Sequence, residues 1–184
     1  SSQVFFLVIH PMDLSAFDYP LPSRLIAQAP SPRRDESRLL AVRRADGRLR
    51  EGRFRDILEY LAPGDALILN NTYVFPARLL GRKEPGGAAI EMLLLEPRGE
   101  GEWDGIAYSA SRRKRGTRIV FSDTFSCVVI DSFGEGKFQV RFAWEGEWEA
   151  ALAAHGHVPL PPYINRPEST DGLDRERYQT IYAR

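Results

Sequence analysis

Three small polar residues, Asn70, Asn71 and Thr72, directly follow the apolar run 66–69. Their side chains offer amide donors, carbonyl acceptors and a hydroxyl. A short apolar run bounded by turn residues predicts a buried central strand, and α/β sheets hold ligands at the ends of their strands. A turn would give the same pattern, because Asn and Thr side chains also bond nearby backbone. Substrate binding and a plain turn both remain open for this segment.

A run of cations and a histidine pair are further candidates for chemistry. The run comprises Arg112, Arg113, Lys114 and Arg115. If it lies on a loop between strands, this run could bind phosphates with salt-dependent affinity, or it could form a solvated hairpin tip. The pair His155-Gly156-His157 matches no common zinc spacing, so we expect no metal. His157 could assist proton transfer, and His155 is expected at the surface of a helix end.

A proline-rich segment follows the histidines. Pro159, Pro161 and Pro162 force an extended backbone, which could present Tyr163 as a stacking surface for a base. The same segment could simply be a strap packed on the core. The sequence contains neither a glycine-rich phosphate loop nor a G-x-S-x-G motif. Their absence weakens the ATPase, dehydrogenase and hydrolase interpretations.

Composition further limits the class of protein to which the chain could belong. The 184 residues carry zero formal net charge at a pI near 6.8, which argues against a generally basic nucleic-acid coat. The single cysteine, Cys127, lies in a strand-like run and is interpreted as a core thiol in a reducing compartment. The apolar run 4–9 is too short to span a membrane. We expect Met12 to be the natural start, and 1–11 to be an extension or an added edge strand.

The remaining patterns predict the elements that position these residues. A strand at 39–43, a hairpin turn at Asp46-Gly47 and an amphipathic helix at 54–61 precede the polar triplet. Short strands with glycine-rich turns then indicate a small antiparallel sheet or barrel over 79–146. These strands are expected at 88–96, 103–108, 118–121, 125–132 and 137–143. Short helices are expected at 23–29, 148–154 and 174–182.

Four blocks of residues stand in order along the chain. They are Asp18 to Pro22 with Leu25 to Gln28, Pro63 to Asp65 with Leu69 to Thr72 and Pro76 to Leu79, Gly156 to Ile164 with Arg166-Pro167, and Tyr178 to Ala183. Together they resemble the S-adenosylmethionine:tRNA ribosyltransferase-isomerase family of the queuosine pathway. The resemblance covers nearly all of this chain but only about the first half of the family. It implies an α/β (mixed α+β) fold, in which a partial α/β sandwich domain, 12–78 and 147–184, carries an inserted antiparallel β-barrel domain, 79–146.

The resemblance also implies a reaction. Such enzymes transfer and isomerise the ribosyl group of S-adenosylmethionine, a co-substrate, onto 7-aminomethyl-7-deazaguanine at the tRNA wobble position. The products are epoxyqueuosine-tRNA, adenine and methionine, with no metal and no membrane involved. We expect a cytoplasmic protein that is a monomer at full length. A non-catalytic RNA-binding module and an inactive fragment of the enzyme are the alternatives.

Site residues carry over only where the blocks match. Catalytic roles fall on His157 and Asn71. The cations 112–115 lie in none of the blocks, and the tRNA substrate that the resemblance implies favours phosphate contacts there. Arg78 would pair with a phosphate or with the methionine carboxylate. Substrate-binding roles fall on Asn70, Thr72, Arg78, Tyr163, Arg166, Tyr178 and Gln179.

Overall fold

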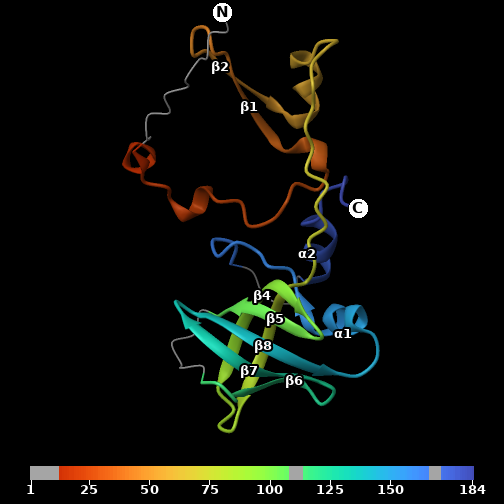
Figure 1. Ribbon diagram of the computed structural model, residues 1–184. Coiled ribbons are helices and arrows are strands. Elements are labelled where there is room, and N and C mark those ends of the chain that lie inside the picture. Colours follow the sequence, from red (N-terminus) through yellow and green to blue (C-terminus); the bar gives the residue numbers. More distant parts are fainter. Residues whose placement is uncertain (1–12, 108–113, 166–170) are drawn as a thin grey trace, which may run out of the picture.

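A closed antiparallel barrel dominates the computed structural model, which describes residues 13–107, 114–165 and 171–184 (Figure 1). The strands follow the order β4-β5-β8-β7-β6-β3, and pairing of β3 with β4 closes the sheet. The short β9 (Gly156–His157) adds to the other end of β3. The six barrel strands are β3 (Arg78–Glu84), β4 (Ala89–Gly99), β5 (Glu102–Ile106), β6 (Arg118–Ser122), β7 (Phe125–Gly134) and β8 (Lys137–Trp144).

Alternating side chains build the barrel core. In β8, Phe138, Val140 and Phe142 are at most 5% exposed, whereas the residues between them are more exposed. This period of two is typical of a strand with one buried face. The predicted barrel strands are therefore confirmed, although β5 ends at Ile106 and Tyr108 lies outside the described residues. The expected mixed α/β class with an inserted barrel is also confirmed.

Helix α1 (Trp148–His155) packs across the barrel through aromatic rings. Trp148 stacks on Trp103 with ring centroids 5.7 Å apart and meets Phe142 edge-on at 5.1 Å. His155 stacks on Phe125 at 5.2 Å, and its Nε2 lies 3.3 Å from the Ser122 hydroxyl. His155 ends the helix as expected, but it is half-buried rather than a plain surface residue, because the aromatic core gives the imidazole a packing partner.

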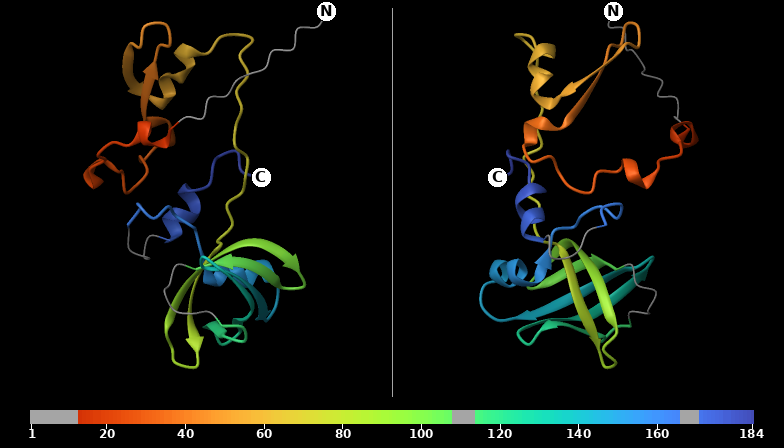
Figure 2. Two further views of the ribbon diagram at one scale, coloured as in Figure 1. Left: turned by 60° about the vertical axis from the view of Figure 1, so that its left-hand side comes forward. Right: turned by 180° about the vertical axis from the view of Figure 1, so that it is seen from behind.

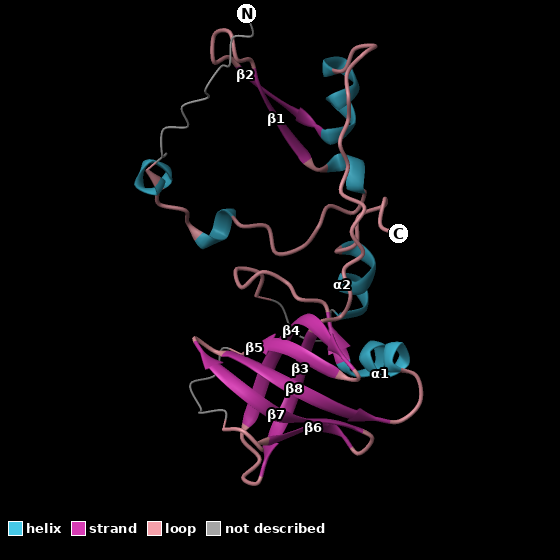
Figure 3. Ribbon diagram, in the orientation of Figure 1, coloured by secondary structure: helices cyan, strands magenta, loops and turns pink. Residues whose placement is uncertain are grey.

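A small second part lies apart from the barrel and carries the N-terminal elements (Figure 3). The β1–β2 hairpin forms as predicted around Asp46-Gly47, and Gly47 has a φ of 68°. A hydrogen bond from the Arg43 guanidinium holds the pKa of Asp46 below its usual value and fastens the turn. The elements are η1 (Leu14–Phe17), η2 (Ser23–Leu25), η3 (Arg34–Glu36), β1 (Arg38–Val42), β2 (Leu49–Arg53) and η4 (Phe54–Tyr60).

Three predicted helices differ in extent or kind. The helix expected at 54–61 is the 3-10 helix η4, whose apolar face stays open, with Leu58 76% exposed. The helix expected at 23–29 is the single 3-10 turn η2, which ends at Leu25 because the backbone of Ile26 is already extended. The C-terminal helix α2 (Asp171–Arg177) begins and ends earlier than expected. No helix of the described residues is long and apolar enough to cross a membrane.

The segment 66–69 overturns a prediction. It was expected to be a buried central strand, yet Ile68 is 95% exposed and Leu67 is 61% exposed. The backbone pairs with no strand among the described residues. An apolar run indicates a tendency to be buried, but a strand also requires a neighbouring strand edge, and the described chain offers none at this point.

Gly156 is the joint between the barrel and the rest of the chain. Its backbone is extended, at φ −87° and ψ 152°, so no left-handed conformation is required. A Cβ built there would lie 2.1 Å from the Pro76 carbonyl oxygen and 2.7 Å from that of Leu152. Only glycine lets the chain after α1 approach the strand entering β3 this closely.

We expect Gly156→Ala to lower the free energy of unfolding by about 1–3 kcal/mol, because the added methyl group forces β9 away from β3. Denaturant unfolding of the two proteins measures the difference. The matched control is Gly172→Ala in α2, where a Cβ meets nothing within 4 Å and the change should not exceed about 1 kcal/mol. An unfolding free energy of Gly156→Ala equal to that of the unmodified chain contradicts the close approach.

Cys127 gives a second prediction. Its side chain is 1% exposed on β7, and burial raises the pKa of its thiol. A thiol whose pKa lies above the usual range stays protonated at pH 8 and reacts slowly. We therefore expect no reaction with a disulfide reagent such as dithionitrobenzoate in the native state and full reaction in guanidinium. Equal rates in both conditions would show that the barrel does not bury this residue.

Candidate substrate-binding region

Three segments distant in sequence meet beside the barrel. They are the linker 70–77 that leads into β3, the strap 158–165, and α2 with the tail 178–184. The linker and α2 run side by side in both views of Figure 2. Most of the residues carried over as substrate-binding groups lie on these three segments, so we take this region as the candidate site.

Gln179 fastens the tail to the linker. Its Oε1 accepts a hydrogen bond from the Val74 amide at 2.9 Å, and its Nε2 donates to the Val74 carbonyl. Thr180 donates from its hydroxyl to the Asn70 carbonyl at 3.0 Å, and the Arg184 amide donates to the Asn71 carbonyl at 3.2 Å. The tail thus supplies the linker with the backbone partners that a neighbouring strand would otherwise provide.

Arginines tie α2 to the other segments. Arg34 donates to the carbonyls of Glu176 and Gln179 at 3.0 and 2.8 Å, which satisfies acceptors at and beyond the end of the helix. From α2, Arg177 donates to the Ser31 and Pro32 carbonyls at 2.6 and 3.1 Å. Arg175 donates to the carbonyl of Gly156, the joint residue. A seam of side-chain-to-backbone bonds, made by Arg34, Arg175, Arg177, Gln179 and Thr180, therefore holds the region together.

One residue of the polar triplet, Asn70, forms a turn, which is one of the two interpretations left open by the sequence. The Asn70 carboxamide oxygen accepts a bond from the Thr72 amide at 2.9 Å, which is an Asx turn. The Asn71 and Thr72 side chains are exposed on the linker. The structure therefore uses Asn70 to shape the backbone and leaves the other two side chains facing solvent.

A pocket of about 280 Å³ lies between the strap, α2 and residues 27–30. Gln28 shapes it by donating to the Tyr163 carbonyl at 3.0 Å and accepting from the Asn165 amide at 2.7 Å. Tyr163 and Tyr178, 58% and 40% exposed, line it together with the buried Asp174. The structure thus brings together two predicted site residues, both with aromatic rings available for contact.

Arg78 and His157 form a separate pair, opposite each other on β3 and β9. The Arg78 guanidinium contacts the Glu91 carboxylate on β4 through Nε at 2.7 Å and through Nη2 at 3.3 Å. A substrate phosphate or carboxylate would therefore have to compete with Glu91 for this group. His157 is partly buried beside it.

The remaining predicted residues lie elsewhere. Lys114 and Arg115 are exposed in the turn before β6, on the barrel. Arg112, Arg113 and Arg166 lie outside the described residues. Within the described parts of the chain, no group of three or more His, Cys, Asp and Glu side chains could hold a metal ion.

The family model described as "Queuosine biosynthesis protein" matches residues 14–184. The chain belongs to this family. A relative from Pelotomaculum thermopropionicum named "S-adenosylmethionine:tRNA ribosyltransferase-isomerase" is 49% identical over 94% of this chain and 50% of its own length. A relative of the same name from Symbiobacterium thermophilum is 44% identical over the same shares.

The chain therefore spans about half the length of the curated family members it matches. A solved structure titled as an S-adenosylmethionine tRNA ribosyltransferase from Thermotoga maritima is 36% identical, and the match covers 87% of this chain and 54% of that one. Its TM-score is 0.38. Membership of the queuosine biosynthesis family consequently rests on sequence, over nearly the whole of this chain.

No sequence pattern singled out the arginines of the seam or Asp174 of the pocket. Asp174 was expected to begin the last helix, but it lies inside α2 and is 6% exposed. Arg34 lies outside the four blocks that carry the resemblance, yet it binds the end of α2. Gln28 lies in a block that carries the family resemblance, which was the available signal for it.

Removing the Gln179 side chain should loosen the linker. Gln179→Ala deletes two hydrogen bonds to Val74, each with a net value of about 1 kcal/mol, so the locally open form should become about thirtyfold more populated. Chymotrypsin cleavage after the exposed Tyr73 should accelerate by the same factor. Gln139→Ala, which removes a bond to Glu102 on the barrel, is the control and should leave this rate unchanged. A cleavage rate in Gln179→Ala equal to that of the unmodified chain would contradict the role of Gln179 in holding the linker.

Proposed function

We propose that this chain provides the substrate-holding portion of a S-adenosylmethionine:tRNA ribosyltransferase-isomerase. The reaction would transfer and isomerise the ribosyl group of S-adenosylmethionine onto 7-aminomethyl-7-deazaguanine at the tRNA wobble position, with release of adenine and methionine. The observation that carries this proposal is the identity of 49% to a relative of that name over 94% of the chain. A tRNA substrate places the reaction in the cytoplasm, and we expect a monomer at full length.

The region beside the barrel fits what this reaction requires. An enzyme for it must hold the sulfonium nucleoside, let adenine leave and present the acceptor amine to the ribose. Tyr163 and Tyr178 would contact flat rings, while the Asn71 and Thr72 side chains would bond ribose hydroxyls or a base edge. His157 would move a proton, and Arg78 would exchange Glu91 for an anionic group of the substrate. Arg166 would support the same site.

The barrel would contact tRNA at the turn before β6. Lys114 and Arg115 are exposed there, and no carboxylate of the described residues forms an ion pair with either of them. Arg118, by contrast, pairs with Glu84 at 3.1 Å. Exposed cations without a carboxylate partner suit phosphate contacts, which position RNA without reading its sequence. With Arg112 and Arg113 they would form the phosphate-binding loop of a barrel domain, 79–146, inserted between 12–78 and 147–184.

A non-catalytic RNA-binding module is the second candidate, and the same exposed cations favour it. It would bind an anticodon stem-loop with an affinity that falls steeply as salt rises, and it would release no adenine. Turnover therefore separates the two functions.

The decisive assay is adenine release from S-adenosylmethionine with an anticodon stem-loop that carries the aminomethyl-deazaguanine. It should be run on this chain and on the chain completed with the remaining half of the Pelotomaculum relative. We expect the completed chain to release adenine with the modified loop only. A loop with unmodified guanine is the control. Absence of release by the folded completed protein contradicts the proposal, and salt-sensitive binding without release would establish the binding module instead.

A further inference from the structure

One aromatic ring of the barrel stays outside the core. Phe133, near the end of β7, is 60% exposed, and none of the ring contacts among the described residues involves it. The other described phenylalanines and tryptophans of the barrel strands lie in the apolar core or pack against it; they are Trp103, Phe121, Phe125, Phe138, Phe142 and Trp144. A single exposed apolar residue is ordinary on a protein surface, so the surroundings of Phe133 decide what its ring can do.

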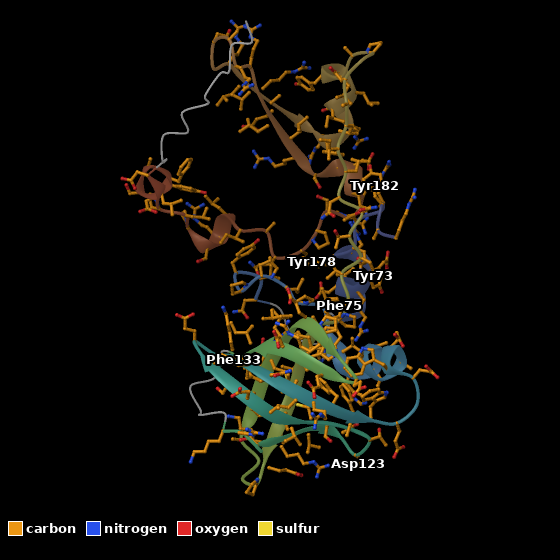
Figure 4. All side chains as sticks on the ribbon, in the orientation of Figure 1. Tyr73, Phe75, Asp123, Phe133, Tyr178 and Tyr182 are labelled. Carbon is orange, nitrogen blue, oxygen red and sulfur yellow. The ribbon has the colours of Figure 1, made fainter. Side chains whose placement is uncertain are left out.

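A tight turn fixes where this ring stands. Glu135 and Gly136 join β7 to β8, and both have positive φ, 46° and 81°, as in the two-residue turns that suit hairpins. The Ala107 amide donates to the Gly136 carbonyl at 3.1 Å, so the chain after β5 braces the turn. Phe133 and Asp123, which flanks the other end of β7, lie at opposite ends of the barrel in Figure 4. A ring on such a short, braced hairpin loses little freedom on binding.

Exposed cations lie on both sides of the ring. Lys137 follows the same turn at the start of β8. On the other side of β7, the turn that carries Lys114 and Arg115 is hydrogen-bonded to the Val129 carbonyl at 2.8 Å. Val129 precedes Phe133 by roughly 13 Å of strand. No ion pair among the described residues involves any of these three cations, Lys114, Arg115 and Lys137, so each is available to a phosphate.

Two carboxylates on the same hairpin restrict the kind of ligand. Asp131 and Glu135 are exposed, and Asp131 accepts a bond from the Ser132 amide at 2.8 Å. They would repel a phosphate held directly at the ring. The face of a nucleotide base carries no net charge and can lie on Phe133 while its phosphates lie toward the three cations. The hairpin therefore favours an unpaired nucleotide over a duplex, whose bases are stacked on one another.

Strand register connects the hairpin with the Arg78–His157 pair. One row of cross-strand partners runs from β8 through β5, β4 and β3 to β9, and it consists of Lys137, Ile106, Leu93, Arg78 and His157. The neighbours Leu79, Met92 and Phe138 are 0% exposed and face the core, so the row lies on the outer surface. Three strand spacings, roughly 14 Å, separate its first and fourth members. The hairpin and the predicted site residues of β3 and β9 thus share one end of the barrel.

We propose that Phe133 is a positioning residue that stacks on an unpaired base of the RNA substrate, close to the nucleotide that reacts near Arg78 and His157. The inference deepens the proposed function and rests on its RNA substrate. Phe133 lies in none of the four blocks that carry the family resemblance, so the resemblance assigns it no role. The three cations contact phosphates of the same strand. The stacked base then fixes the register of the loop, so that one nucleotide rather than its neighbour reaches the site.

Equilibrium binding of a fluorescently labelled anticodon stem-loop tests this role. It is measured by anisotropy on this chain and on the chain completed with the remaining half of the Pelotomaculum relative. A fully paired duplex of the same stem, which offers no unpaired base, is the comparison RNA. Phe133→Ala and Phe133→Leu should each weaken stem-loop binding about tenfold and change duplex binding less than about twofold. Phe133→Tyr keeps an aromatic face and should bind the stem-loop as the unmodified protein does.

Salt dependence separates stacking from charge. Phe133→Leu should leave the slope of log affinity against log salt unchanged, because it removes no phosphate contact. Lys114→Gln should weaken both RNAs and reduce the slope by about 1. The matched control is Phe17→Ala in η1, since Phe17 is 59% exposed and the chemical change is the same. This control should leave the affinity for both RNAs unchanged.

Three results would overturn the role of Phe133. They are a stem-loop affinity of Phe133→Leu equal to that of the unmodified protein, an equal loss for stem-loop and duplex, and a failure of both folded unmodified proteins to bind the stem-loop. Adenine release by the completed chain is measured separately. Release with equal stem-loop affinities would reject the stacking and leave the proposed function standing. A selective loss of stem-loop affinity without any release would support the stacking and reject the enzyme.

Discussion

The seam of side-chain-to-backbone bonds is the constraint on which the candidate site depends. Residues 70–74 of the linker pair with no strand among the described residues, so their backbone groups must find other partners. Gln179 supplies both partners of Val74, and Thr180 bonds Asn70. Each such bond contributes about 1 kcal/mol net, so several acting together are needed to order an extended segment.

The barrel and the seam differ in what stabilises them. The barrel core is a continuous cluster of apolar side chains, including Leu79, Met92 and Phe138 at 0% exposure. The seam consists mainly of polar bonds at part-exposed positions. Regions that carry function are commonly drawn from the less stable parts of a fold, while a rigid scaffold positions them. Gly156 connects the two, because its missing side chain lets β9 lie against the chain entering β3.

The sequence predicted what depends on local pattern. Alternation of Phe138, Val140 and Phe142 predicted β8, and Asp46-Gly47 predicted the first hairpin, because a strand face and a tight turn are encoded within a few residues. The seam could not be predicted this way, since Gln179 and Val74 are 105 positions apart. The segment 66–69 was misjudged for a related reason: apolar residues indicate burial without naming the surface that covers them. Tyr163 and Tyr178 entered through the family resemblance, and only the structure places them around one pocket.

Residue-resolved amide hydrogen exchange on the unmodified chain tests the seam most directly. Amides of β7 and β8 should exchange slowest, the Val74 amide at an intermediate rate, and the Ile68 amide near the rate of an unstructured peptide. That order would show that polar side-chain bonds, rather than a sheet, hold the linker. A Val74 amide as fast as Ile68 would show that the seam does not form. An Ile68 amide as slow as Val140 would instead place segment 66–69 in a sheet.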